Sequence, residues 1–224
     1  MGKVTLSGQN NITSPNGNSL ALFVDGATGI MKVKDVMGNI QPLSDFIPSI
    51  IIQTGNHGLF AQTSNSTPIT STIAETGLLG TGVGTLSVPA NGFSIGDSFS
   101  ANMSGLMSAK NNDSITIRIK SGSVVLADSG ALSLPSITNQ VWNLTINFTI
   151  STIGGVNVAS IVTFGEMHIL KLASGTQQGF GFNTVNTTTF DTTVLNTLEI
   201  TAQWSSNNAN NSIYSDIFVL NKSY

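Results

Sequence analysis

The stretch VWNLTINFTIST, positions 141–152, decides the fold class of this chain. Every second side chain in it is large and apolar, and the residues between are Asn, Thr or Ser; the apolar set is Trp142, Leu144, Ile146, Phe148 and Ile150. Successive side chains of a β-strand point to opposite faces, so this stretch has one apolar face and one neutral polar face. The pattern predicts a long antiparallel strand that is covered on one side only.

The same alternation recurs elsewhere in the chain. Ile115, Ile117 and Ile119 alternate with polar residues, and a further set with this period is Leu198, Ile200, Ala202 and Trp204. Strand candidates separated by turn-forming residues are 69–73, 85–88, 98–107, 114–120, 124–126, 141–153, 158–170, 197–204 and 212–220. Antiparallel sheets with one apolar face each bury those faces by packing together. Residues 69–224 are therefore predicted to form an all-β, antiparallel β-sandwich of jelly-roll type.

Composition favours the same fold class. Charged residues make up only 8% of the chain, against roughly 25% in an ordinary soluble domain. Asn, Ser, Thr and Gly take their place, with 23 glycines in all. Thr, Val, Ile and Phe favour strands, and Asn, Ser and Gly favour turns, whereas helix surfaces usually carry long charged side chains. A surface with so few charges also lacks the repulsion that keeps proteins apart, which favours self-association.

Charge and hydropathy exclude several classes of partner. The net charge is −3, and the eight basic residues are scattered from Lys3 to Lys222, whereas nucleic-acid binding needs clustered Lys and Arg. No window approaches the roughly 20 apolar residues of a membrane span, and residues 1–4 lack the apolar region of a signal peptide. The chain has no cysteine, which fits synthesis in a cytoplasm. We therefore expect no nucleic-acid partner and no membrane insertion.

The N-terminal part has its own pattern. Two short apolar stretches, 19–24 and 30–34, flank the glycine-containing turn DGATG at 25–29, which predicts a β-hairpin. A single hairpin is marginally stable in water, so we expect residues 1–54 to be an arm that docks on another surface. The apolar residues expected to anchor this arm are Leu20, Leu22, Phe23, Ile30 and Met31. Residues 55–68 are rich in Gly, Asn and Ser and are predicted to be a linker.

Residues that could carry chemistry are few and isolated. His57 is expected in a solvated loop, and His168 follows Glu166 on a predicted strand, which supplies only two ligands of a metal site. The glycine-rich stretch 77–84 is not a dinucleotide fingerprint, because Thr85 stands where a third glycine is needed, and no lysine follows as in a P-loop. No serine-centred nucleophile elbow occurs. We predict a non-enzymatic protein with no catalytic residue, no cofactor and no metal.

The last predicted strand, 212–220, is apolar on both faces. Ile217 and Val219 point to one side, and Tyr214, Phe218 and Leu220 are expected on the other. Two interpretations stay open: a central strand covered by a loop, or a strand whose outer face meets another subunit. On the second interpretation, Tyr214, Phe218 and Leu220 form the oligomer interface.

A second binding mode is possible at two predicted loops, 175–182 and 205–211. Their Asn and Gly residues could offer amide hydrogen bonds to a glycan, and Phe180 or Phe182 could stack on a sugar ring. This mode would make the sandwich a module that recognises a glycan or protein on a host surface.

Several segments resemble a known kind of viral protein. These are LLGTGVGTLSVPA (78–90), RIKSGSVVLAD (118–128), FDTT (190–193), ITAQW (200–204) and SIYS (212–215). Together they are similar to β-sandwich proteins on the virions of tailed bacteriophages, of the head fibre or capsid decoration family. The stretch LFVDGATG (22–29) resembles the opening of some phage fibre and decoration proteins.

This resemblance implies a structural role on the virion surface after synthesis in the host cytoplasm. It implies an N-terminal anchor, an outer sandwich and a homotrimer, with other capsid or tail proteins as partners. The alternative it leaves open is a receptor- or glycan-binding module of a tail fibre or spike, which would serve host attachment.

Overall fold

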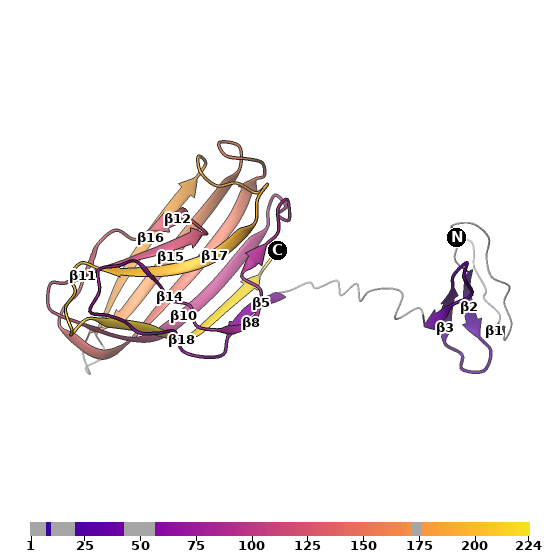
Figure 1. The fold of residues 1–224 in the computed structure, drawn as a ribbon, viewed down its shortest axis with the longest axis horizontal. Helices are drawn as coiled ribbons and strands as arrows, with labels where there is room; N and C mark the ends of the chain where they lie inside the picture. The colour runs from indigo at the N-terminus through magenta and orange to yellow at the C-terminus, as the bar shows by residue number, and fades with distance from the viewer. Residues whose placement is uncertain (1–7, 10–20, 43–56, 172–175) are drawn as a thin grey trace. The chain divides into compact units, whose positions relative to one another are not determined.

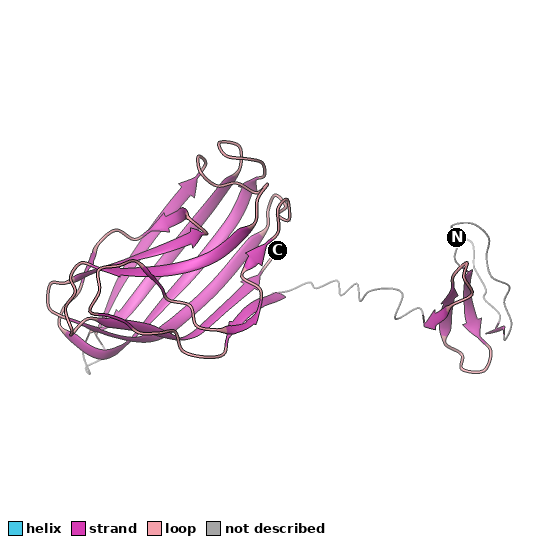
Figure 2. Ribbon diagram, viewed as in Figure 1, coloured by secondary structure: helices cyan, strands magenta, loops and turns pink. Residues whose placement is uncertain are grey.

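The computed structural model describes residues 8–9, 21–42, 57–171 and 176–224. The chain divides into two compact units, residues 1–53 and 54–224. Every regular element in the described residues is a β-strand (Figure 2). The predicted all-β fold class is therefore confirmed.

The first unit is a small sheet with the strand order β1-β2-β3-β4. Its strands are β1 (Gly8–Gln9), β2 (Ala21–Asp25), β3 (Met31–Lys34) and β4 (Ile40–Pro42). β1 is parallel to β2, and the other pairs are antiparallel. In the turn between β2 and β3, the Asp25 carboxylate accepts the backbone N–H groups of Ala27 and Thr28 and lies 2.8 Å from Lys32 Nζ. The predicted hairpin thus forms, closed by an aspartate that caps its own turn.

The second unit is a sandwich of two antiparallel sheets (Figure 1). The larger sheet contains, in order, β16 (Gln177–Asn186), β15 (Ser160–Leu170), β14 (Ile137–Thr152), β10 (Ser98–Ala109), β18 (Ser212–Lys222), β5 (His57–Gln62) and β8 (Gly82–Gly84), with β6 (Ile69–Thr70) beside β18. The smaller sheet contains β12 (Val124–Asp128), β11 (Ser114–Ser121), β17 (Asn196–Trp204) and β7 (Thr76–Gly77), with β13 (Leu132–Ser133) and β9 (Ser87–Val88) at its sides.

The connections between the sheets follow a jelly-roll pattern. β10 pairs with β18 in the larger sheet, and the strands next to them in sequence, β11 and β17, pair in the smaller sheet. The chain segments 98–121 and 196–222 therefore run as one antiparallel ribbon that is folded across both sheets. The core lies between the layers, where the alternating apolar residues of β11, β14 and β17 are buried.

Two tryptophans show how the alternation is converted into packing. Trp142 of β14 and Trp204 of β17 are both fully buried, one from each sheet. Their indole N–H groups donate to backbone carbonyls, that of Trp142 to Leu106 and Tyr214 at 3.2 Å, and that of Trp204 to Ile69 at 3.1 Å. Each ring therefore fills the core without leaving a buried donor unpaired.

The prediction that residues 55–68 form a linker is corrected by the structure. Residues 57–62 lie within the segment 55–68 and form β5, which pairs with β18 through Leu220 and Phe60. His57, expected in a loop, begins this strand. The apolar residues of this strand, 59–61, are few and are preceded by glycine and asparagine, so the sequence gives a weak strand signal. The segment becomes a strand because it pairs with β18. The sandwich therefore includes residues before position 69.

The glycine-rich stretch 77–84 contributes to two short strands, β7 and β8. β8 pairs with β5, and Gly82 and Gly84 lie directly against the backbone carbonyl groups of Ala61 and Leu59. A Cβ at either position would overlap these carbonyls, and Gly84 also has a positive φ of 99°. Glycine is required here because the backbones approach so closely.

Candidate functional site

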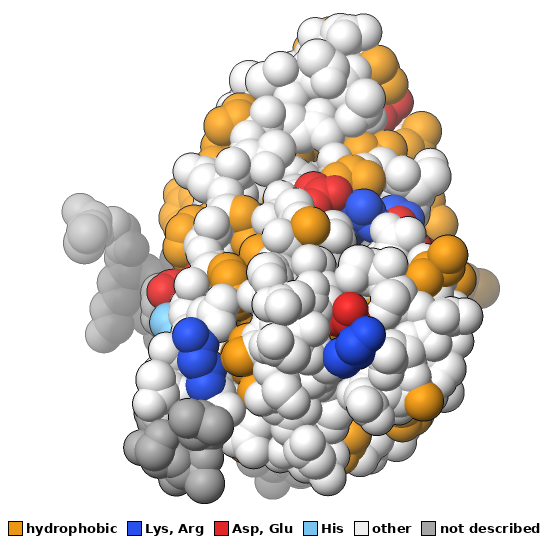
Figure 3. Space-filling model, turned by 90° about the vertical axis from the view of Figure 1, so that its left-hand side faces the viewer, with side chains coloured by type: hydrophobic (Ala, Val, Ile, Leu, Met, Phe, Trp, Pro, Cys, Tyr) orange, Lys and Arg blue, Asp and Glu red, His pale blue; other side chains and the backbone are white. Residues whose placement is uncertain are grey.

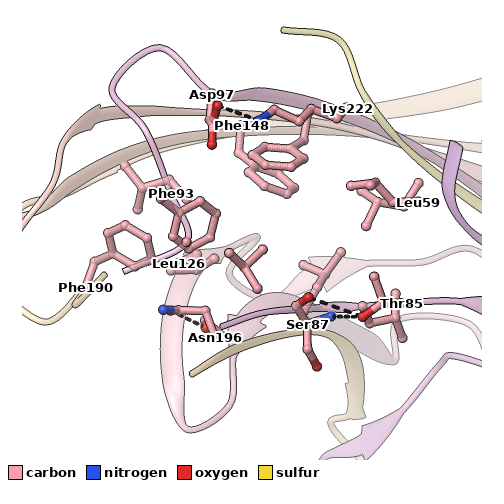
Figure 4. A pocket seen from close by; sticks show the side chains of 18 of the residues that line it. Leu59, Thr85, Ser87, Phe93, Asp97, Leu126, Phe148, Phe190, Asn196 and Lys222 are labelled. Atoms are coloured by element: carbon pink, nitrogen blue, oxygen red, sulfur yellow. Dashed lines mark hydrogen bonds and ion pairs between the residues drawn. The ribbon is translucent and has the colours of Figure 1, made fainter. Parts of the chain in front are cut away.

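An apolar cavity of about 140 Å³ lies between the two sheets, close to the segment that connects β9 to β10 (Figure 4). Both sheets contribute apolar walls: Leu59, Phe99, Phe148, Ile161 and Leu220 come from the larger sheet, and Val88, Leu126 and Leu198 from the smaller one. Phe93 and Phe190 complete the walls from loops. The cavity is therefore a gap at the edge of the core that is partly open to solvent.

The phenylalanine rings around this cavity contact one another. Phe99 and Phe148 are stacked, with ring centroids 4.8 Å apart. Phe93 meets Phe99 edge-on at 6.1 Å and also contacts Phe190 at 5.9 Å. These separations are those of favourable aromatic pairs, and all four side chains are buried. The rings thus hold one another in place around the space.

The polar side chains of the cavity walls already have partners. Lys222 Nζ lies 2.6 Å from Asp97 Oδ1 and 5.8 Å from the centre of the Phe99 ring. Ser121 donates to Asn196 Oδ1 at 2.8 Å, and the Asn196 amide donates to the Asp191 and Val194 carbonyls. The remaining lining pairs are Thr85 with the backbone of Ser87, the Ser87 hydroxyl with Thr197, and Lys120 with Glu75. The walls therefore offer an apolar surface with its polar groups satisfied.

Such a space has a physical cost. Its apolar walls are partly in contact with solvent, which costs about 25 cal/mol for each Å² of exposed apolar surface. Water that enters meets mainly apolar walls. The arrangement can therefore accommodate an apolar group.

Charged side chains gather at one further place, on the outer face of the smaller sheet. Arg118 donates to Glu75 at 3.0 Å and to Asp128 at 2.7 Å, and Lys120 lies 2.9 Å from the other Glu75 oxygen. Thr201 also donates to Glu75 at 2.8 Å. The hydrogen bond from Lys120, followed by that from Thr201, lowers the pKa of Glu75. This network fastens the segment before β7 to the sheet, since each cation is paired and the carboxylate is kept ionised.

Glu166 and His168 lie close together, but no third possible metal ligand among the described residues lies beside them. The His168 Nε2 and Glu166 Oε1 atoms are 2.9 Å apart on β15, and both side chains are half-buried. Within the described ranges, no group of three or more His, Cys, Asp or Glu residues could hold a metal ion. The pair has the geometry of a surface hydrogen bond.

The interface residues expected on β18 need correction. Phe218 and Leu220 are buried in the core, at 0% and 3% exposure. The pairing with β10 shifts between Ser104, opposite Ile217, and Gly105, opposite Ser215. This β-bulge reverses the facing of the strand at its middle, which strict alternation from the sequence could not reveal.

As a result, Tyr214 and Ile217 lie on the outer face of β18, where Ile217 is 50% exposed and Tyr214 is half-buried. Val219 is half-buried on the same face. The neighbouring strands add Leu106, paired with Tyr214, and Val141, paired with Leu106. We call these five side chains the outer apolar patch.

The two expected glycan-contacting phenylalanines are also placed differently. Residues 177–186 form β16 rather than a loop, and Phe180 and Phe182 are half-buried against the core. The Phe182 ring covers Gly165 of β15 closely. These rings are therefore part of the packing between the sheets and do not form a free stacking surface.

The loop 205–211 directs several of its polar groups inward. Asp113 accepts the Ser206 hydroxyl at 2.6 Å and the Asn211 amide at 2.8 Å, and these two bonds lower its pKa. The Asn211 side chain also accepts the backbone N–H of Lys110. These groups stabilise the loop and are not free for a ligand.

The N-terminal unit exposes apolar side chains. Phe23 and Val33 are buried within it, whereas Leu22, Ile30 and Met31 are exposed. Met37, in the turn before β4, is 84% exposed. Leu20 lies outside the described residues. Of the residues expected to anchor the arm, Leu22, Ile30 and Met31 are thus available for contact, and Phe23 belongs to the unit's own core.

No known protein family has a model that matches this chain, and no curated protein matches it. In the part of the chain that the structure describes, no helix is long and apolar enough to cross a membrane.

Proposed function

We propose that the chain is a non-enzymatic structural protein of a virus particle surface, which docks through its N-terminal unit and presents the sandwich outward. The observation that carries this proposal is the separate small unit, whose described residues expose several apolar side chains, Leu22, Ile30, Met31 and Met37, and bury Phe23 and Val33. A unit that exposes several large apolar side chains is suited to packing against a partner. The resemblance of residues 22–29 to phage fibre and decoration proteins supports the same role.

The outer face of the larger sheet supports a structural role as well. Its central rows pair neutral side chains across β10 and β14: Ser100 with Asn147, Asn102 with Thr145, and Ser104 with Asn143. Figure 3 shows one side of the molecule, where charged side chains occupy small, separate areas of a mainly neutral surface. Such a surface depends little on ionic strength and repels its own copies weakly, which suits a component of an assembly.

The outer apolar patch supports self-association. Tyr214, Ile217 and Val219 of β18 lie beside Leu106 and Val141 on adjacent strands. We assign this patch to contacts between copies of the chain in a homotrimer, in place of the buried Phe218 and Leu220. A closed ring of copies would cover apolar side chains that would otherwise be solvated.

Docking can be tested with full-length chains mixed with purified particles that lack the protein. Leu22→Glu combined with Met31→Glu puts charge on the exposed face of the N-terminal unit, and co-sedimentation with particles is expected to fall at least about tenfold. Val185→Glu, at an exposed position on β16 of the sandwich, is the control and should bind like the unmodified chain. Equal binding by all three chains would contradict docking through the N-terminal unit.

A further inference from the structure

We propose that the cavity between the sheets binds a small, neutral, apolar molecule about the size of one aromatic ring. This inference goes beyond particle assembly, because it assigns a ligand site inside the sandwich that docking does not use.

Size and wall chemistry define the ligand. The cavity has a volume of about 140 Å³ and mainly apolar walls, and an enclosed cavity of about 150 Å³ with Leu, Ile and Phe walls takes up benzene. Figure 4 shows Phe93, Phe148, Leu126 and Leu59 directed toward the same space from different elements. A planar ring entering here could meet the phenylalanines in edge-to-face contact, the arrangement that Phe93 and Phe99 already adopt.

Charge at the cavity excludes ionic ligands. Lys222 and Asp97 neutralise each other at 2.6 Å, and the Asp97 carboxylate also accepts the Ser94 backbone N–H at 3.0 Å. The Asp97 side chain is only 8% exposed. A carboxylate ligand would have to compete with Asp97 for Lys222, and an ammonium ligand with Lys222 for Asp97, so each would bury an unpaired charge. A neutral molecule avoids this cost.

The hydrogen bonds of the cavity walls also favour a neutral apolar ligand. The hydroxyl and amide groups of the walls, those of Thr85, Ser87, Ser121 and Asn196, are already bonded within the protein. In the cavity, a ligand acceptor would find the side-chain donors of these groups already used, and a ligand donor would exchange water for at most a shared hydroxyl or amide oxygen. We therefore expect toluene to bind more tightly than phenol or benzylamine, which have about the same size.

The direct test is a titration of the full-length chain with toluene, followed by methyl chemical shifts in NMR spectra. Saturable shifts are expected at Ile161, Leu126 and Leu198, which line the cavity, and not at Leu134, which is equally buried but is not part of the walls. No saturable shift, or equal shifts at Leu134 and at the cavity residues, would overturn the proposal.

A filled cavity provides the second test. Val88→Phe adds volume at a half-buried wall position and should weaken toluene binding at least about tenfold. Val185→Phe, at an exposed position of β16 that does not line the cavity, is the matched control and should leave binding unchanged. If Val88→Phe does not fold, Leu198→Ala replaces it: the enlarged cavity should then bind naphthalene more tightly than the unmodified chain does. Unchanged ligand preference in the folded variant would contradict the assigned site.

Discussion

Gly105 of β10 lies directly against the backbone carbonyl of Tyr214 in β18, with no room for a Cβ between them. The contact occurs at the bulge where the pairing of the two strands shifts by one residue. This local irregularity decides which side chains of β18 enter the core and which form the outer apolar patch.

Gly105→Ala is therefore expected to destabilise the sandwich by about 2 kcal/mol, because overpacking against a backbone costs about 1–3 kcal/mol. Gly181→Ala in β16 is the matched control, since a Cβ there meets nothing within 4 Å. Denaturant unfolding measures both. Equal stability of the two variants would show that the close approach does not exist.

Because Phe218 faces the core and Ile217 faces outward, substitutions at these adjacent positions of β18 should affect stability very differently. Phe218→Ala should lower the free energy of unfolding by about 3–5 kcal/mol, because Phe218 is fully buried. Ile217→Ser should change it by less than about 0.5 kcal/mol, as surface substitutions usually do, and should reduce self-association in light scattering. A folded Phe218→Ala chain of normal stability would contradict the bulge.

Thr163 offers a stabilising substitution. Its hydroxyl is buried, and it has no hydrogen-bond partner among the described residues. Thr163→Val keeps the shape and removes the unsatisfied group, so we expect a gain of about 1 kcal/mol in unfolding free energy. Thr201→Val is the control: it removes the hydrogen bond to Glu75 and should destabilise. A loss of stability at position 163 would indicate that the hydroxyl is satisfied.

The lowered pKa of Glu75 predicts that the stability of the sandwich depends on pH. Its folded-state pKa is lowered below the ordinary value of 4.5, so the unfolded chain binds more protons near that pH. The contribution of this carboxylate is therefore fully present above pH 4.5 and is lost as pH falls through the lower, folded-state pKa. Glu75→Gln should lower stability by about 1 kcal/mol at neutral pH and by less in acid. A pH-independent difference between the two chains would contradict the network.

Much of the fold could be predicted from local alternation. The predicted strands 114–120, 141–153 and 197–204 follow from period-two patterns and correspond to β11, most of β14 and β17. β16 was harder to predict, since Gly179 and Gly181 alternate with Phe180 and Phe182 and the stretch reads as a flexible loop. Gly179 and Gly181 occupy the solvent-facing positions of β16, where strands usually carry polar side chains, so the usual alternation of apolar and polar residues is missing.

The candidate sites depended on tertiary structure. The bulge at Gly105 is a property of the pairing of two strands that are more than a hundred positions apart, and alternation within β18 alone gives the wrong facing. The cavity is a gap between side chains from both sheets and several loops. Neither feature leaves a local signature in the sequence, whereas the aspartate turns at Asp25 and Asp35 do, and both carboxylates accept N–H groups of their own turns.

The central claim is that this chain is a surface component of a virus particle. Electron cryomicroscopy of purified particles that carry the full-length chain tests it most directly. We predict density for the β-sandwich outside the shell, in groups of three, with the N-terminal unit in contact with the particle. Density for the sandwich inside the shell, or no density for it on the particle surface, would contradict the account.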